Sequence, residues 1–255
     1  MSATSGAVAL VTGGGSGIGR AAAQRLAADG AAVVVADLNA EGAARTVALI
    51  EAAGGTAVAI TADIASEDDN QRMFDLAEQQ FGGIDMAFLN AGMLQPYIPI
   101  EDVTTALFDR IIAVNLRGTF LGIQQALRRL RRGGACVVTS SSAGLIGFAD
   151  AAAYSTSKHG LVGLVRSSAA SFAARGLRIN AICPGMVLTP MNGLDGSEAI
   201  DDPDTLDYPD YRGGLSAQQV AEAAIFLMSR RAAGINGQAQ LVDAALLSSF
   251  PPIAG

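Results

Sequence analysis

Apolar residues in this chain gather in short continuous runs, separated by longer segments in which they recur every three or four positions. Continuous rather than alternating runs are typical of strands buried on both faces of a parallel sheet. Seven runs predict β-strands, at Val8–Val11, Ala32–Ala36, Thr56–Thr61, Ile84–Leu89, Ala135–Ser140, Arg178–Cys183 and Gln240–Val242. The segments between them predict α-helices at 18–29, 40–53, 67–81, 104–131, 153–174 and 216–229.

The repeated order of strand, helix and strand predicts an α/β fold with a doubly wound parallel sheet of about seven strands. Right-handed crossovers place helices on both faces of such a sheet. Several predicted helices are followed by a glycine, which favours helix C-termini: Gly30, Gly54, Gly82 and Gly133. No internal repeat or low-complexity linker interrupts residues 1–255, so we predict a single domain.

One long segment, residues 190–215, breaks the alternation of strands and helices. It contains four glycines, three prolines and seven acidic residues against one arginine. A loop of this length in a compact domain is usually functional or disordered. We interpret residues 186–215 as a lid over a ligand site, and a solvated insertion is the alternative.

Composition excludes several classes of protein. Half of the 255 residues are hydrophobic and 16% are charged, which excludes intrinsic disorder. The net charge of −7 disfavours a nucleic-acid partner, because binding to phosphates needs clustered Lys and Arg. No apolar run approaches 18 residues and no Lys or Arg precedes Arg20, so we expect no membrane span, no secretory signal and a cytoplasmic protein.

The chain has few residues suited to metal or redox chemistry. Cys136 and Cys183 each lie inside an apolar run, which predicts buried thiols rather than a redox pair. The one histidine, His159, excludes a His-rich metal site, and no metal is predicted. Because His159 directly follows Lys158, it points about 100° away on a helix and is assigned to packing or the surface.

The segment that follows the first predicted strand is rich in glycine. Residues 12–19 read Thr-Gly-Gly-Gly-Ser-Gly-Ile-Gly and lead into a predicted helix. Glycines let the backbone approach a pyrophosphate closely, and the free N–H groups of a helix N-terminus favour an anion. The turn therefore indicates a dinucleotide site. Its spacing, Gly-x-x-x-Gly-x-Gly, differs from the more frequent Gly-x-Gly-x-x-Gly, and an ordinary glycine-rich turn is the alternative.

An acidic residue, Asp37, follows the second predicted strand, 18 residues after Gly19. A carboxylate at this place accepts hydrogen bonds from ribose hydroxyls and repels a 2′-phosphate. Neither Ser16 nor Leu38 offers a cation to such a phosphate, so NAD is predicted in preference to NADP. The alternative role for Asp37 is a helix N-cap.

The only lysine of the chain, Lys158, lies four residues after Tyr154 in a predicted helix. Residues at i and i+4 share a helix face, with Cβ atoms about 5–6 Å apart. Lowering the pKa of a tyrosine by two units from its usual value near 10 takes about 2.7 kcal/mol. An ammonium about 4 Å away supplies roughly 4 kcal/mol at an effective dielectric constant of 20. The pair predicts a tyrosine that exchanges protons near neutral pH, and a chance pair on a surface helix is the alternative.

Three serines, Ser140–Ser142, close a predicted strand at its carboxyl end, where α/β folds bind ligands. A hydroxyl there can hold a carbonyl or alcohol oxygen, although serines are also routine in turns.

Taken in order, these residues resemble the short-chain dehydrogenase/reductase family. The resemblance rests on Thr12-Gly-x-x-x-Gly-Ile-Gly, Asp63, Asn90-Ala91-Gly92, Asn115, Ser141, Tyr154-x-x-x-Lys158 and Pro184-Gly185. It covers nearly the whole chain, and it implies a single Rossmann-type domain that binds a nicotinamide dinucleotide.

The resemblance also implies a role for each matching position. Ser141 orients the substrate and Tyr154 is the general acid and base. Lys158 lowers the pKa of that tyrosine and binds the nicotinamide ribose, while Asn115 holds a water that links the lysine to solvent. The implied coenzyme-binding residues are Gly13, Gly15, Ser16, Gly17, Ile18, Gly19, Asp37, Leu38, Asp63, Ile64, Asn90, Ala91, Gly92, Tyr154, Lys158, Pro184, Gly185, Val187 and Thr189.

Two positions depart from the family pattern. Leu89 stands where the family usually has the first of two asparagines, and Asp243-Ala244-Ala245 replaces a frequent Asp-Gly-Gly. The tail at 246–255 is therefore not expected to follow the family.

The expected function is an NAD-dependent oxidoreductase that interconverts a secondary alcohol (a polyol, a sugar or another small hydroxy compound) and its ketone. One alternative is an NADPH-dependent reductase of 3-ketoacyl groups on an acyl carrier protein, docked at Arg128, Arg129, Arg131 and Arg132. The simpler role for these arginines is to complement the dipole at the end of the predicted long helix. A second alternative is a non-catalytic dinucleotide-binding protein.

The predicted helix at 153–174 carries small and apolar residues on more than one face, which indicates burial on more than one side. Together with helix 104–131 it resembles the pair that forms the family's dimer. We therefore expect a homo-oligomer, either a dimer or a tetramer, that acts on a small molecule.

Overall fold

A parallel sheet of seven strands organises the residues that this computed structural model describes, which are 4–193, 206 and 214–248. The strands lie in the order β3-β2-β1-β4-β5-β6-β9, and each neighbouring pair is parallel. They are β1 (Val8–Thr12), β2 (Ala32–Asp37), β3 (Thr56–Thr61), β4 (Ile84–Leu89), β5 (Leu130–Thr139), β6 (Arg178–Pro184) and β9 (Ala239–Val242). The doubly wound α/β fold predicted from the sequence is confirmed.

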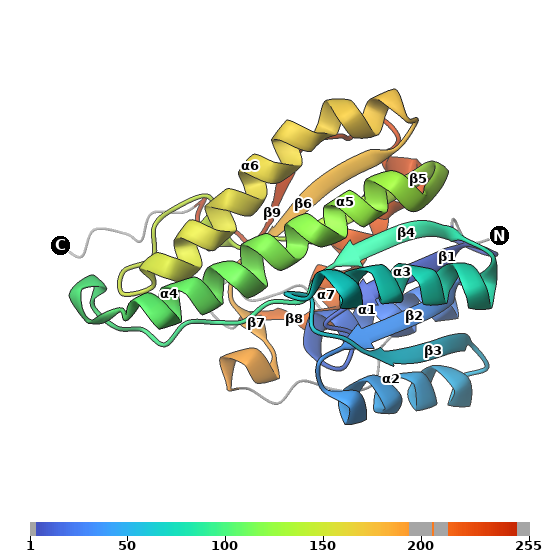
Figure 1. Cartoon of the computed structure of the whole chain (residues 1–255), viewed down its shortest axis with the longest axis horizontal. Helices are drawn as coiled ribbons and strands as arrows, with labels where there is room; N and C mark the ends of the chain where they lie inside the picture. Colours follow the sequence, from blue (N-terminus) through green and yellow to red (C-terminus); the bar gives the residue numbers. More distant parts are fainter. Residues whose placement is uncertain (1–3, 194–205, 207–213, 249–255) are drawn as a thin grey trace.

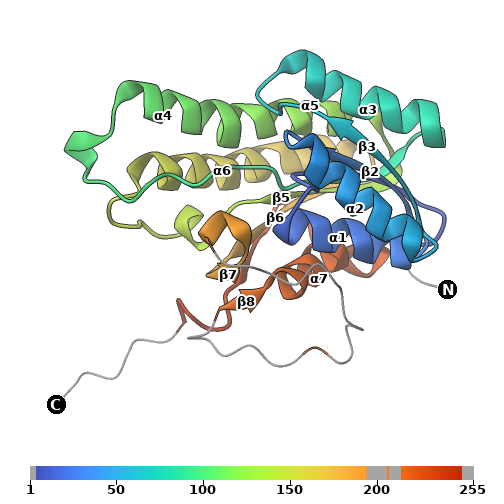
Figure 2. The ribbon, with the colours of Figure 1, turned by 90° about the horizontal axis from the view of Figure 1, so that it is seen from below.

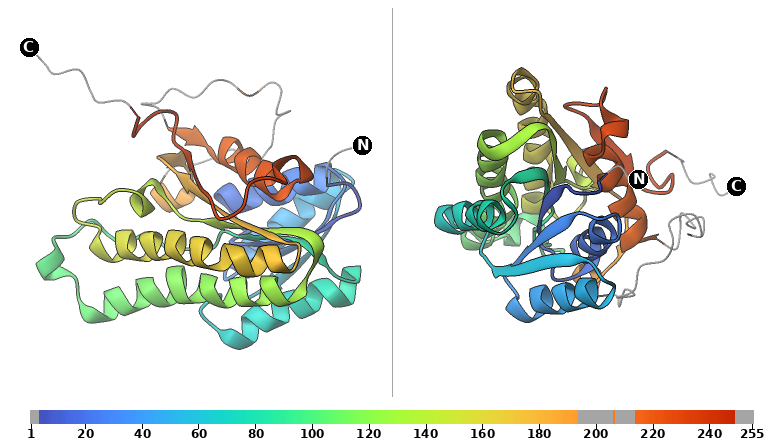
Figure 3. Two further views of the ribbon diagram at one scale, coloured as in Figure 1. Left: turned by 90° about the horizontal axis from the view of Figure 1, so that it is seen from above. Right: turned by 90° about the vertical axis from the view of Figure 1, so that its right-hand side faces the viewer.

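Helices cover both faces of this sheet (Figures 1 and 2). One layer consists of α1 (Gly17–Ala28), α2 (Ala40–Ala52) and α7 (Ala217–Met228). The other consists of α3 (Glu67–Phe81), α5 (Thr119–Arg129) and α6 (Ala152–Ala174), and α4 (Thr105–Ile111) leads into α5. The end-on view in Figure 3 shows the sheet between these layers.

Successive strand residues alternate between two hydrophobic cores because side chains of a strand point to opposite faces. In β2, Val33 and Val35 belong to the core under α1 and α7, while Val34 and Ala36 belong to the core under α3, α5 and α6. Both faces of the central strands are therefore buried, which explains the continuous apolar runs in the sequence. Cys136 and Cys183 are buried, unpaired thiols, as predicted.

The strand order reverses between β1 and β4, which are hydrogen-bonded neighbours. Chain segments leave the carboxyl ends of these two strands toward opposite sides of the sheet. Open α/β sheets bind ligands in the crevice that such a reversal creates. The predicted glycine-rich turn follows β1, and the predicted Asn90-Ala91-Gly92 segment follows β4, so both lie at this crevice.

The predicted helix at 104–131 is wrong in its middle and at its end. A π-helical stretch, Ile112–Gly118, separates α4 from α5, and β5 already begins at Leu130 rather than at residue 135. Leu130 is buried and pairs with Ile84, so tertiary pairing overrides the helical pattern of the preceding residues. Gly133 is consequently a strand residue with φ +90 instead of a helix cap.

Two short strands lie at the two ends of the predicted lid. Strands β7 (Val187–Leu188) and β8 (Leu215–Ser216) form a small parallel sheet that was not predicted, because two residues carry no readable period. Residues 194–205 and 207–213 of the predicted lid lie outside the described residues, as does the tail from residue 249.

Within the described ranges, no helix combines the length and the apolarity that crossing a membrane requires. In those same ranges, no three His, Cys, Asp or Glu side chains gather as metal ligands would.

Candidate active site

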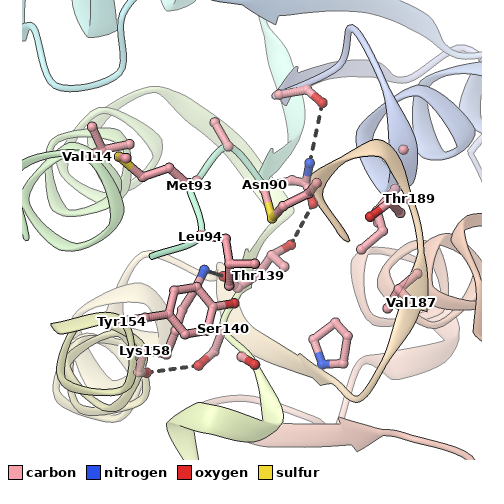
Figure 4. Close-up of a pocket in the computed structure, with 18 of the residues that line it drawn as sticks. Asn90, Met93, Leu94, Val114, Thr139, Ser140, Tyr154, Lys158, Val187 and Thr189 are labelled. Atoms are coloured by element: carbon pink, nitrogen blue, oxygen red, sulfur yellow. Dashed lines mark hydrogen bonds between the residues drawn. The ribbon is translucent and has the colours of Figure 1, made fainter. Parts of the chain in front are cut away.

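A cavity of about 940 Å³ opens at the carboxyl ends of the central strands (Figure 4). This volume is at the upper end of the usual range for ligand sites. The cavity is lined by every predicted site residue except Gly15, Gly19 and Asn115. The structure thus brings together in one place residues that the sequence spreads from position 13 to position 189.

Four glycines of the turn after β1, Gly13, Gly14, Gly15 and Gly19, are packed too closely to carry a side chain. A Cβ on Gly19 would lie 2.0 Å from the Gly13 carbonyl oxygen, and one on Gly13 would lie 2.9 Å from the Ala91 Cα. Gly13 also has φ +64, a conformation that favours glycine. Ser16 is the N-cap of α1 but makes no side-chain cap hydrogen bond. The turn is therefore a close-fitting backbone cradle at a helix N-terminus, which fits the phosphates of a dinucleotide.

Asp37, at the end of β2, presents its carboxylate to the cavity. One carboxylate oxygen accepts the Gly15 N–H at 2.8 Å and the other accepts the Asn39 N–H at 2.8 Å. Asn39, not Asp37, caps α2, because its side chain accepts the N–H groups of Glu41 and Gly42. The alternative role of Asp37 as a helix cap is therefore wrong, and the residue remains available as a ribose-facing carboxylate.

Two threonines, Thr12 and Thr139, connect the strand ends around Asn90, and Figure 4 shows Thr139 beside Asn90. Thr12 Oγ1 accepts the N–H groups of Asn90 and Ala91, at 3.0 and 3.1 Å. Thr139 Oγ1 donates to Asn90 Oδ1 at 3.0 Å. In the sequence, a threonine at a strand end cannot be distinguished from any other β-branched strand residue. The structure shows that these two threonines fix the ends of β1, β4 and β5 relative to one another.

The predicted Ser-Tyr-Lys set comes together at the α6 side of the cavity. Tyr154 and Lys158 share one face of α6, and the Lys158 Nζ lies 5.5 Å from the centroid of the Tyr154 ring. Ser141, just after β5, lies near Tyr154, and its hydroxyl lowers the pKa of that phenol. Val187 and Thr189 lie on the opposite side of the cavity in Figure 4. The arrangement leaves space between these three residues and the segment after β6.

Lys158 is a buried cation, only 4% exposed. Its ammonium donates to the Thr139 carbonyl at 3.0 Å, and its own backbone carbonyl accepts the Ser140 hydroxyl at 2.9 Å. Burial lowers the pKa of Lys158 from 10.5 to about 8, against a smaller opposing effect of the nearby Cys183. This lysine therefore exchanges protons close to neutral pH.

The pKa of Tyr154 differs from the prediction, which was based on the neighbouring Lys158. Burial raises the pKa of Tyr154 above the ordinary value of 10, and Tyr97 adds to the increase. The group that acts in the opposite direction is Ser141, whose hydroxyl lowers the pKa of Tyr154. The predicted net lowering is not what this structure gives, because a sequence pattern cannot show how much the phenol is desolvated.

Asn115 lies in the π-helical stretch and is fully buried. Its side-chain oxygen accepts the Met93 N–H at 2.8 Å, and its amide nitrogen donates to the Met93 carbonyl at 2.9 Å and to the Ser157 hydroxyl at 3.2 Å. The side chain thus ties the segment after β4 to α6. Its implied role in holding a water stays a prediction.

The cavity wall beyond the residues predicted to bind the coenzyme is mainly apolar. It is formed by Met93, Leu94, Tyr97, Val114, Phe148, Ala151, Met186, Met191 and Leu246. Among the described lining residues the cations are Arg110 and Lys158, and neither belongs to the turns after β1 and β2. This part of the cavity suits a compact apolar compound.

A Lys158→Met variant should be more stable than the unchanged protein at pH 7. The difference between 10.5 and about 8 corresponds to about 3 kcal/mol of unfavourable burial. The lost hydrogen bond to Thr139 offsets about 1 kcal/mol of the gain. Between pH 8 and 10.5 the unfolded chain binds more protons than the folded one, so the stability of the unchanged protein rises with pH. The advantage of the variant should therefore shrink across that window.

Urea unfolding at pH 7 and pH 10 measures this difference. Arg72→Met, which removes a largely exposed cation, is the control and should change stability by less than about 1 kcal/mol at either pH. A Lys158→Met protein that is less stable than the unchanged protein at both pH values would contradict the cost assigned to the buried ammonium.

The family model described as "Enoyl-(Acyl carrier protein) reductase" matches residues 13–245. The chain is 38% identical to 2,5-dichloro-2,5-cyclohexadiene-1,4-diol dehydrogenase from Sphingobium indicum, over 95% of this chain and 98% of that one. It is 37% identical to cyclohexanol dehydrogenase from an Acinetobacter species, over 94% and 95%.

Solved structures agree with these relatives. The 3-ketoacyl-(acyl-carrier-protein) reductase from Brucella melitensis, complexed with NADH, superposes with a TM-score of 0.84 at 30% identity. The match covers 95% of this chain and 99% of that chain. Matching structures include complexes with NADH and with NADP. The fold, the cavity at its strand reversal and the relatives agree, and this chain belongs to the short-chain dehydrogenase/reductase family.

Proposed function

We propose that this protein is an NAD-dependent oxidoreductase that interconverts a secondary alcohol on a compact apolar ring and the corresponding ketone. The observation that carries the proposal is the Ser141, Tyr154 and Lys158 set at the edge of a cavity whose neighbouring wall is apolar. Three residues of this apolar wall lie close to Tyr154 along the chain or through a hydrogen bond. Phe148 and Ala151 come shortly before Tyr154 in the sequence, and Leu94 comes directly before Gln95, whose side chain accepts the Tyr154 backbone N–H.

Ring alcohols are favoured over polyols and sugars, which the sequence left open. Several hydroxyl groups placed against methionine, leucine and phenylalanine side chains would lack hydrogen-bond partners, and each such group costs roughly 1–3 kcal/mol. Two relatives support the same class of substrate, because their names describe dehydrogenases of a cyclohexadienediol and of cyclohexanol.

The residues divide the reaction among them. Ser141 holds the substrate oxygen, and Tyr154 takes the hydroxyl proton during oxidation and returns it during reduction. Lys158, with a pKa of about 8, exchanges a proton with its surroundings near neutral pH. The hydride would pass between the substrate carbon and a bound nicotinamide dinucleotide. The turns after β1, β2 and β4 and the segment after β6 would hold it.

Asp37 supports NAD as the preferred coenzyme. Its carboxylate is fixed by two backbone N–H groups at the carboxyl end of β2, where a 2′-phosphate would meet a like charge. Leu38, the next residue, is largely exposed and brings no cation.

The arginine group does not support docking of an acyl carrier protein. Arg131 and Arg132 lie in β5 rather than at the end of a helix, and Arg129 pairs with Asp75 at 2.6 Å. These residues lie near the amino end of β5, and a strand of ten residues spans roughly 30 Å. A carrier bound there would be at the opposite edge of the sheet from the cavity.

We also propose that copies of this chain associate, as dimers or tetramers, through the outer surface of α5 and α6. A shallow groove there is lined by Ile112, Leu116, Arg117, Phe120, Gly160 and Leu164. Exposed apolar surface of this kind is covered at low cost by a second copy.

The cytoplasm is the proposed location, and the two buried, unpaired thiols suit its reducing conditions.

Replacing Tyr154 with Phe should lower kcat for ring alcohols by about 10²–10⁴-fold, because proton transfer loses its partner. Binding of NADH, followed by its fluorescence, should change little. Oxidation of cyclohexanol with NAD, read as the absorbance of reduced coenzyme, measures the loss. A variant with unchanged kcat would show that Tyr154 takes no part in the reaction. A protein that binds NADH but oxidises no alcohol in a broad panel would instead indicate a dinucleotide-binding protein without catalysis.

Replacing Asp37 with Asn should reduce the preference for NAD. The amide oxygen keeps one acceptor for the loop N–H groups, while the charge that repels a 2′-phosphate is lost. Adding Leu38→Arg supplies a cation for that phosphate, and the ratio of kcat/KM for NADP over NAD should rise by about tenfold or more. An unchanged protein that already uses NADP as well as NAD would contradict the assignment.

Light scattering at micromolar concentration should give the mass of a dimer or a tetramer. Phe120→Glu, which places a charge in the apolar groove, should shift the mass toward the monomer. A monomeric mass for the unchanged protein would refute the proposed association.

A further inference from the structure

The helix that carries the catalytic tyrosine begins without a capping side chain of its own. The N-cap of α6 is Ala151, which makes no side-chain cap hydrogen bond. By contrast α2, α3 and α7 are capped by Asn39, Ser66 and Ser216. The first backbone N–H groups of a helix have no partner within it, so those of α6 must find one elsewhere.

Gln95 provides that partner from a different part of the chain. Its Oε1 accepts the Tyr154 backbone N–H at 3.0 Å, and its Nε2 donates to the Asp150 carbonyl at 3.3 Å. The Asp150 carbonyl also accepts the Ile98 N–H at 2.9 Å. Gln95 is only 1% exposed and does not line the cavity, so it reaches the reaction only through Tyr154.

The segment that ends at Gln95 begins in the coenzyme site. We call residues 90–95 the strap. Asn90, at its start, is bonded to Thr12, and Met93, in its middle, exchanges two hydrogen bonds with Asn115. Pro96 follows the strap and restricts the backbone of Gln95 to extended conformations. The strap therefore has fixed points at the coenzyme edge, at the π-helical stretch and at the catalytic helix.

Lys158 has supports that do not depend on the strap. Its ammonium is held by the Thr139 carbonyl, and its backbone carbonyl by the Ser140 hydroxyl. If the first turn of α6 shifted, Tyr154 would move while Lys158, one turn further along, stayed in place. The geometry within the pair therefore depends on what holds the first turn.

We propose that Gln95 is a positioning residue that caps α6 from the strap and thereby sets the place of the Tyr154 hydroxyl relative to the coenzyme site. The proposal rests on the function proposed above for Tyr154. A displacement of about 1 Å in a reacting group can cost roughly 10²-fold in rate, so a single buried amide is sufficient to matter.

The test uses Gln95→Met, which keeps the length of the side chain and removes both hydrogen bonds. We expect kcat for a ring alcohol, counted per NADH-binding site, to fall by about 10–100-fold, while the NADH dissociation constant changes less than twofold. The primary deuterium isotope effect on kcat should increase, because hydride transfer becomes slower than product release. Counting by binding sites removes any contribution from unfolded protein.

Gln219→Met is the matched control. Gln219 is also a glutamine at a helix start, where its Oε1 accepts the Ser216 N–H at 2.9 Å, but it belongs to α7 and does not line the cavity. We expect this variant to lose a similar amount of stability with kcat and the isotope effect unchanged. Gln95→Glu, which retains an acceptor for Tyr154, should give a kcat between those of Gln95→Met and the unchanged protein.

Hydrogen exchange of the Tyr154 backbone amide tests the cap without any turnover. It should be protected in the unchanged protein and in Gln219→Met, and it should exchange at least tenfold faster in Gln95→Met. Unchanged exchange, or a kcat per site within twofold of the unchanged protein, would overturn the role of Gln95. If no ring alcohol is oxidised by the unchanged protein, the proposed function fails, and the exchange result still decides whether Gln95 caps α6.

Discussion

The burial of one ammonium, that of Lys158, is the constraint on which the site depends. The group lies at the carboxyl end of β5 with a backbone carbonyl as its partner, and burial brings its pKa down to about 8. An arginine would not serve there, because its guanidinium is planar and keeps its proton far above neutral pH. This explains why the only lysine in a chain otherwise rich in arginine stands at this position.

Burial affects the two members of the Tyr-Lys pair in opposite directions. It favours the neutral form of each, so it raises the pKa of Tyr154 and lowers that of Lys158. The Ser141 hydroxyl is the group that favours the phenolate. The protein on its own therefore keeps Tyr154 protonated below pH 10, a state suited to donating a proton to a ketone oxygen.

The sequence predicts much of this architecture because its signals are local. Continuous apolar runs identify the strands, and the glycines after β1 identify a closely packed backbone, in which a Cβ added to Gly13 would lie 2.9 Å from the Ala91 Cα. The start of β5 was missed because Leu130 and its arginine neighbours read as the end of a helix until their pairing with β4 is known. Gln95 was missed for a related reason, since its partners lie 55 and 59 residues away. The direction of the Tyr154 pKa was wrong because desolvation depends on the whole fold.

The connections between the strand ends at the cavity and α6 are made largely by neutral amides. Through their side chains, Asn90 joins the ends of β1 and β5, Asn115 holds Met93, and Gln95 holds Tyr154. Aspartate or glutamate at these places would keep an acceptor oxygen but lose the N–H donor that each amide directs to a backbone carbonyl, and each would add a negative charge near a pair whose protonation is set by local charge. Such a charge would oppose the phenolate and stabilise the ammonium. Amide side chains fix the geometry and leave this balance unchanged, while the carboxylate of Asp37 lies at the end of β2, away from α6.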